Sequence, residues 1–124
     1  MPYVSIYATQ GISTEQKKTL LQRSSDAVVD AIGAPLPSVR IMLHELQEGH
    51  YLNAGKFDTA GLMFQVEFIE GRTIEQKEAL IGALSRVGEQ VTGIPESEVR
   101  VRLIDFPKSN MGMAGGVSAR AMGR

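Results

Sequence analysis

The chain contains two copies of one pattern, and this repeat limits the folds open to it more than any other feature. The stretch from Gly11 to Lys17 is closely similar to the stretch from Gly71 to Lys77. Further landmarks recur at the same spacing: Pro35 and Pro95, Arg40 and Arg100, Gly55 and Gly115. A constant spacing means that nothing has been inserted or deleted between the copies. The sequence therefore predicts two equivalent structural units in one polypeptide.

Each copy has the pattern of a strand, a helix and a second strand. Residues 3–8 and 64–69 are short runs rich in β-branched and aromatic side chains, which are typical of strands. The stretches 13–16 and 73–76 fit the capping box that opens a helix. Gly33 and Gly93 are plausible helix ends, and a proline two residues later prevents continuation. Apolar residues then alternate with polar ones over 39–43 and 99–103, which indicates the second strands.

Two such units predict an α+β fold in which two consecutive β-α-β units share a sheet. The crossover rule gives parallel strands within each unit, so a four-stranded, mainly parallel sheet with both helices on one face is expected. We expect residues 1–52 to form the first unit, 53–61 a linker and 62–124 the second unit, together making one domain. Residues 117–124 show little apolar pattern and are expected to be mobile. The uncovered sheet face predicts an oligomer.

Composition excludes several classes of function. The formal net charge is -1, so no overall basic field attracts nucleic acid or an anionic membrane. There is no cysteine, which excludes disulfides and thiolate metal sites, and two histidines are too few to indicate a metal centre. The first residues lack the features of a secretion signal, so a cytoplasmic location is expected.

The amino terminus offers a distinctive base. Aminopeptidases remove an initiator methionine when a small residue follows it, and Pro2 follows Met1. The mature chain would then begin with a secondary amine. Burial and nearby arginine cations lower the pKa of such an amine, and a neutral amine can act as a general base.

These features together resemble one known family. Pro2 followed by a strand, and the stretches 34–40, 49–51 and 70–77, are similar to 4-oxalocrotonate tautomerase, a short chain of one β-α-β unit. The resemblance covers nearly the whole chain and identifies it as a fused, two-unit member of the tautomerase superfamily. It implies a homotrimer that acts on a small carboxylate substrate without a cofactor or metal. In that family the proline moves a proton on a 2-hydroxydienoate or an enol pyruvate to give a 2-oxo acid.

The resemblance also implies that the two halves have divided the catalytic work. Pro2 corresponds to the catalytic proline and Arg72 to the loop arginine that grips a carboxylate. The counterpart of Arg72 in the first half is Ile12, and the counterpart of Pro2 in the second half is Leu62. We therefore expect one working site per chain, formed between Pro2 and Arg72.

Four further residues correspond to parts of the family's site. Arg40 and Arg100 both match the second arginine, and the sequence leaves open which of them serves Pro2. Tyr51 matches the aromatic wall of the site, while Met111 stands at the equivalent place in the second half.

Three other functions remain open at this level. A dehalogenase or hydratase of the superfamily needs a carboxylate and an extra arginine, and residues 111–114 and Ile69 do not supply them. A decarboxylase of a 3-oxo acid is a second alternative. The third is a catalytically inactive binding protein of the same fold, for which a retained Met1 would argue.

Overall fold

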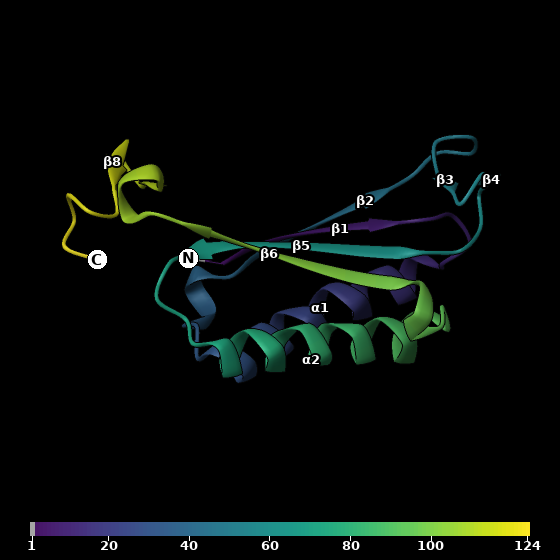
Figure 1. The fold of residues 1–124 in the computed structure, drawn as a ribbon, viewed down its shortest axis with the longest axis horizontal. Coiled ribbons are helices and arrows are strands. Elements are labelled where there is room, and N and C mark those ends of the chain that lie inside the picture. The colour runs from purple at the N-terminus through teal and green to yellow at the C-terminus, as the bar shows by residue number, and fades with distance from the viewer. Residues whose placement is uncertain (1) are drawn as a thin grey trace.

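The computed structural model describes residues 2–124 as one four-stranded sheet with two long helices on one face (Figure 1). The first unit comprises β1 (Tyr3–Ala8), α1 (Thr14–Ile32) and β2 (Arg40–Glu45), and the second comprises β5 (Leu62–Ile69), α2 (Ile74–Thr92) and β6 (Val99–Phe106). Short 3-10 helices, Leu36–Ser38 and Glu96–Glu98, join each long helix to its second strand. The predicted fold class is confirmed.

The strand order β2-β1-β5-β6 places the two units back to back. Strands are parallel within a unit, but β1 and β5 pair antiparallel, with Tyr3 opposite Glu67 and Ala8 opposite Leu62. The start of each unit's first strand therefore lies beside the end of the other unit's first strand. The sheet thus has two ends of similar construction, one at Pro2 and one at Leu62.

The helix boundaries follow the predicted signals. Ser13 accepts a hydrogen bond from the backbone N–H of Gln16 (3.1 Å), and the Gln16 side chain accepts one from the N–H of Ser13 (2.8 Å). Thr73 and Gln76 repeat this exchange at the start of α2. Both helices end at a glycine in the left-handed region, with φ of 64° at Gly33 and 77° at Gly93. The reciprocal caps satisfy backbone donors that the first helical turn leaves free.

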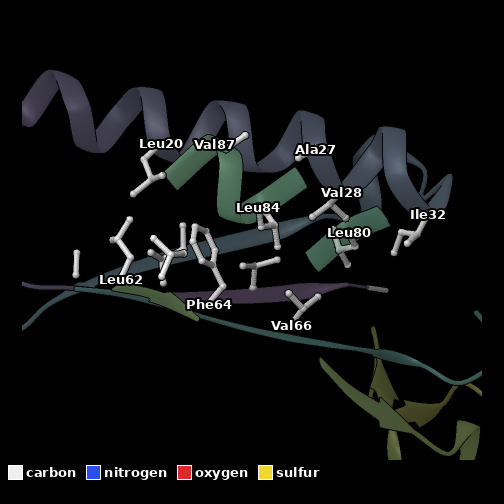
Figure 2. Packing of buried hydrophobic residues seen from close by; sticks show 14 of the residues in the cluster. Leu20, Ala27, Val28, Ile32, Leu62, Phe64, Val66, Leu80, Leu84 and Val87 are labelled. Carbon is white, nitrogen blue, oxygen red and sulfur yellow. The ribbon is translucent and has the colours of Figure 1, made fainter. Parts of the chain in front are cut away.

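The core lies between the helices and the covered face of the sheet (Figure 2). Alternate residues of β1 and β5 point toward the helices, because successive side chains in a strand alternate between faces. The fully buried set includes Val4, Ile6, Phe64, Val66, Leu20, Val28, Leu80 and Leu84. The other face is open in the single chain, where Met42 is 41% exposed and Ile104 38%. Among residues 2–124, the structure has no helix with the length and apolar character of a membrane span.

At the Leu62 end of the sheet, the residue equivalent to Pro2 is part of the hydrophobic core. Leu62 is fully buried, and its Cδ1 lies 3.1 Å from where a Cβ on Gly88 would stand. The first half has Val28 at the place of Gly88 and the smaller Pro2 at the place of Leu62. A larger residue on the strand is therefore matched by a smaller one on the helix, which keeps the interior close-packed.

Replacing Gly88 with valine is expected to destabilise the protein by about 1–3 kcal/mol, because the new side chain would overlap Leu62. Thermal or urea unfolding measures this loss. Gly82 in the same helix is the matched control, because a Cβ there would meet only the flexible end of Arg86. Gly82→Ala is expected to raise stability by up to about 1 kcal/mol through helix propensity. Equal effects of the two substitutions would contradict the packing role of Gly88.

Ser24 is a polar exception in the core. Its side chain is fully buried, and its hydroxyl has no hydrogen-bond partner among residues 2–124. The equivalent residue in α2 is Leu84. Ser24→Ala is therefore expected to stabilise the chain by about 1 kcal/mol, since it removes a desolvated polar group and gains helix propensity. A lower midpoint in chemical unfolding would show that the hydroxyl has a partner in solution.

Two short hairpins were not predicted. The segment 53–61, predicted as a linker, carries β4 (Lys56–Phe57), which pairs with β3 (Leu52–Asn53). β7 (Gly112–Met113) pairs with β8 (Val117–Ser118), and Arg124 N–H donates to the carbonyl of Ala119 (3.0 Å). The final residues thus have defined structure, contrary to the mobile tail expected from composition. Two-residue strands are too short to produce an alternating pattern that a sequence could reveal.

Candidate active site

Pro2 directly precedes β1 and is held there by the neighbouring strand. Its ring is fully buried, on the side of β1 that Val4 and Ile6 share. Its carbonyl oxygen accepts a hydrogen bond from the backbone N–H of Arg40 (3.1 Å). The position of Pro2 is therefore fixed by the sheet and by the core rather than by a loop.

Arg72 lies at the same end of the sheet, although it is distant in sequence. It follows β5 after a turn in which Gly71 has φ of 125°, a value that side-chain-bearing residues rarely adopt. Its Nη1 donates to the carbonyl of Ile69 (3.3 Å), and the antiparallel register brings this end of β5 beside the start of β1. The structure thus brings Pro2 and Arg72 to one end of the β1–β5 pair.

The two candidate second arginines occupy opposite ends. Arg40 pairs with Tyr3 at the start of β2, whereas Arg100 pairs with Met63 at the start of β6. Their side chains have the same local anchor, since Arg40 Nη1 donates to the carbonyl of Pro37 (2.7 Å) and Arg100 Nη1 to that of Ser97 (2.7 Å). Within one chain, Arg40 is the arginine at the Pro2 end.

Tyr51 and Met111 are also separated. Tyr51 precedes β3 and lines a cavity of ≈ 300 Å³ together with Arg100, Asn53, Met63 and Glu98, at the Leu62 end. Met111 precedes β7, in the hairpin that projects from the opposite end of the sheet, where β1 begins (Figure 1). The predicted aromatic wall therefore lies away from Pro2 within one chain, and Met111 lies nearer to it.

The Leu62 end lacks the chemistry of the Pro2 end. Leu62 lies within the chain, so its nitrogen is an amide and cannot act as a base. Ile12 stands at the place of Arg72 and lines a second cavity there, of ≈ 280 Å³, beside Gly93 and Ile94. This end keeps Arg100, but Leu62 supplies no free α-amine and Ile12 supplies no cation in place of Arg72.

Sequence reasoning missed Phe68. Its ring is 0% exposed, and the guanidinium carbon of Arg72 lies 5.6 Å from the ring centroid. Tyr3 lies opposite Glu67, so Phe68, the next residue of β5, lies at the end of the sheet where Pro2 precedes β1. A signal was available, because the equivalent residue in the first half is Ala8. The difference between Ala8 and Phe68 accompanies the difference between Ile12 and Arg72.

Other features of the described chain do not add to this site. No group of three or more histidine, aspartate or glutamate side chains that could hold a metal occurs within residues 2–124. An open groove of ≈ 410 Å³ runs between α1 and α2, lined by residues such as Arg23 and Arg86, and contains none of the candidate residues.

Comparison with known proteins gives consistent matches along the whole chain. A family model described as tautomerase enzyme matches residues 2–60 and again residues 64–121. A 2-hydroxymuconate tautomerase of Comamonas testosteroni is 45% identical over 60 residues, which are 48% of this chain and 94% of that protein. A 2-hydroxymuconate tautomerase of Pseudomonas putida is 47% identical over the same shares.

Solved structures match over nearly the full length. The structure described as Pt0534 inactivated by 2-oxo-3-pentynoate is 74% identical, with a TM-score of 0.97, over 98% of this chain and 99% of that one. A wild-type fused 4-OT, described as a symmetric trimer, is 43% identical, with a TM-score of 0.94 over the same shares. The two 2-hydroxymuconate tautomerases thus match about half of this chain, and the two solved structures match nearly all of it.

Proposed function

Because this chain belongs to the family of tautomerase enzymes, we propose that it converts 2-hydroxydienoates or enol pyruvates to 2-oxo acids, with the amine of Pro2 as general base. The observation that supports this most strongly is the convergence of Pro2 and Arg72 on one end of the β1–β5 pair. A proton transfer on a carboxylate substrate needs a base and a cation that contact the same bound substrate molecule. The single-unit relatives named 2-hydroxymuconate tautomerase also suggest this substrate class.

The proposed reaction moves one proton. The neutral Pro2 nitrogen accepts the proton of the substrate's 2-hydroxyl group, and the electron pair shifts through the conjugated double bonds. Pro2 then returns the proton to a carbon atom of the substrate, and the substrate is left with a 2-oxo group. Positioned proton transfer of this kind contributes about 10²- to 10⁴-fold to the rate.

Arginines are proposed to bind the negative charges. The planar guanidinium of Arg72 can donate two hydrogen bonds to a substrate carboxylate, and its charge also disfavours protonation of the Pro2 amine. We assign the second arginine to Arg40 or to Arg100, because an oligomer can bring Arg100 of a neighbouring chain to the Pro2 site. Met111 is proposed as the apolar wall of this site, and Tyr51 as its counterpart at the other end.

A homotrimer is the proposed assembly. The open face of the sheet exposes Met42 and Ile104, and the fused 4-OT relatives are described as trimers. Burying this face between chains would remove apolar surface from water. It would also enclose the Pro2 end, which the helices cover on one side only.

The experiment that tests this proposal is a turnover assay of purified protein whose amino terminus has been verified. Intact mass first establishes whether Met1 has been removed. Ultraviolet absorbance then follows ketonisation of 2-hydroxymuconate and of phenylenolpyruvate, while sedimentation measures the mass of the assembly. Turnover by chains that begin at Pro2 is expected. No turnover of either substrate by such chains would contradict the proposed function.

A further inference from the structure

The aromatic ring of Phe68 contacts Arg72, the proposed carboxylate-binding arginine. The Arg72 guanidinium carbon lies 5.6 Å from the centre of the Phe68 ring, within the range of a cation–π interaction. The ring itself is 0% exposed, so the surrounding core restricts the positions it can take. Arg72 remains partly exposed, which leaves its guanidinium accessible to a ligand.

Comparison of the two halves shows that the β-α-β fold does not require an aromatic residue at the place of Phe68. The first half has Ala8 at the place of Phe68, and Ala8 is also fully buried. The β-α-β unit can therefore be built with a methyl group at this place. The first half also has Ile12 at the place of Arg72. The aromatic ring thus occurs in the half that carries the loop arginine.

Two contacts together restrict the orientation of the Arg72 side chain. The carbonyl of Ile69 accepts a hydrogen bond from Nη1 (3.3 Å), which fixes one edge of the guanidinium. The guanidinium carbon itself lies over the Phe68 ring, 5.6 Å from the ring centroid. A long arginine side chain loses rotamer freedom when it binds a carboxylate, so restricting it beforehand strengthens binding. The N–H groups of Arg72 that do not take part in these contacts are then held in a fixed orientation, available to a substrate.

We propose that Phe68 is a positioning residue, which holds the Arg72 guanidinium ready for the substrate carboxylate. This inference rests on the proposed function of Arg72. It predicts that Phe68 affects substrate binding through Arg72 rather than through the chemical step at Pro2.

The test is a double-mutant cycle between the two residues. Phe68→Leu is expected to raise KM by about 3- to 30-fold with a much smaller change in kcat, since a cation–π contact is lost. In an Arg72→Ala background the same substitution is expected to have little further effect on KM. Phe68→Tyr retains the ring and is expected to restore a KM close to that of the unmodified protein.

A matched control separates positioning from packing. Phe64 lies in the same strand on the same face and is also buried, with an exposed fraction of 1%. Phe64→Leu is expected to lower the unfolding midpoint as Phe68→Leu does but to leave KM unchanged. Equal KM effects of Phe68→Leu with and without Arg72, or an unchanged KM in Phe68→Leu, would overturn the inference while the proposed function stands.

An NMR measurement tests the contact between Phe68 and Arg72 without an activity assay. Because the Arg72 guanidinium carbon lies over the Phe68 ring, the ring current should move the chemical shifts of the guanidinium protons upfield. Phe68→Leu is expected to abolish that shift, and Phe68→Tyr to preserve it. If the unmodified protein has no tautomerase activity, the proposed function fails, and an unshifted Arg72 signal would show separately that the positioning contact is absent.

Discussion

Replacing Pro2 with leucine is expected to reduce kcat by about 10³- to 10⁴-fold, the upper part of the range for loss of a positioned general base. Leucine is the residue that the second half has at this place, at Leu62. A large residue in the second position also blocks removal of Met1, so no free amine would remain at the start of β1. The ketonisation assay measures the loss, and the intact mass verifies the retained methionine.

Pro2→Ala is the informative companion to this variant. Alanine allows Met1 to be removed and leaves a primary amine at the same point of the chain. We expect a smaller loss than for Pro2→Leu, about 10²-fold, since an amine remains but is no longer held in a ring. Unfolding midpoints of both variants control for damage to the core that the buried Pro2 ring helps to fill. If Pro2→Leu retained full kcat, the amine would not be the base.

Much of the fold could be predicted because the sequence contains it twice. The capping boxes at Ser13 and Thr73 and the terminal glycines Gly33 and Gly93 act locally, so they identify the helices without knowledge of the rest. The start of the fifth strand was less predictable. β5 begins at Leu62 rather than at Phe64, because pairing with Ala8 extends it. Tertiary pairing of this kind is not visible in a local pattern.

The candidate site was only partly accessible from sequence. Pro2 and Arg72 stand out because the repeat differs at both places. Their shared location depends on the antiparallel pairing of β1 with β5, which the repeat alone does not determine. The separation of Arg40 from Arg100 depends on the same pairing. Phe68 was missed because it reads as an ordinary core residue until the structure places it against Arg72.

Replacing Arg72 with alanine is expected to lower kcat/KM by about 10²-fold, mainly through KM, because charge-assisted hydrogen bonds to the substrate carboxylate are lost. Arg72→Lys retains the charge but not the planar pair of donors, so an intermediate loss is expected. The side chain's one hydrogen bond within residues 2–124 is the contact with the Ile69 carbonyl, and folding should therefore survive both substitutions. Steady-state kinetics over a range of substrate concentrations separate KM from kcat.

Arg86 provides the matched control, since it is an exposed arginine on α2 and lines the groove between the helices that contains none of the candidate residues. Arg86→Ala is expected to leave kcat/KM unchanged. The converse substitution, Ile12→Arg, would place a loop arginine at the Leu62 end, where no free amine exists. It is therefore expected to add no activity, because a cation without a base cannot move the proton. Added activity in Ile12→Arg that survived the loss of Pro2 would show a second working site and would refute the division of labour between the halves.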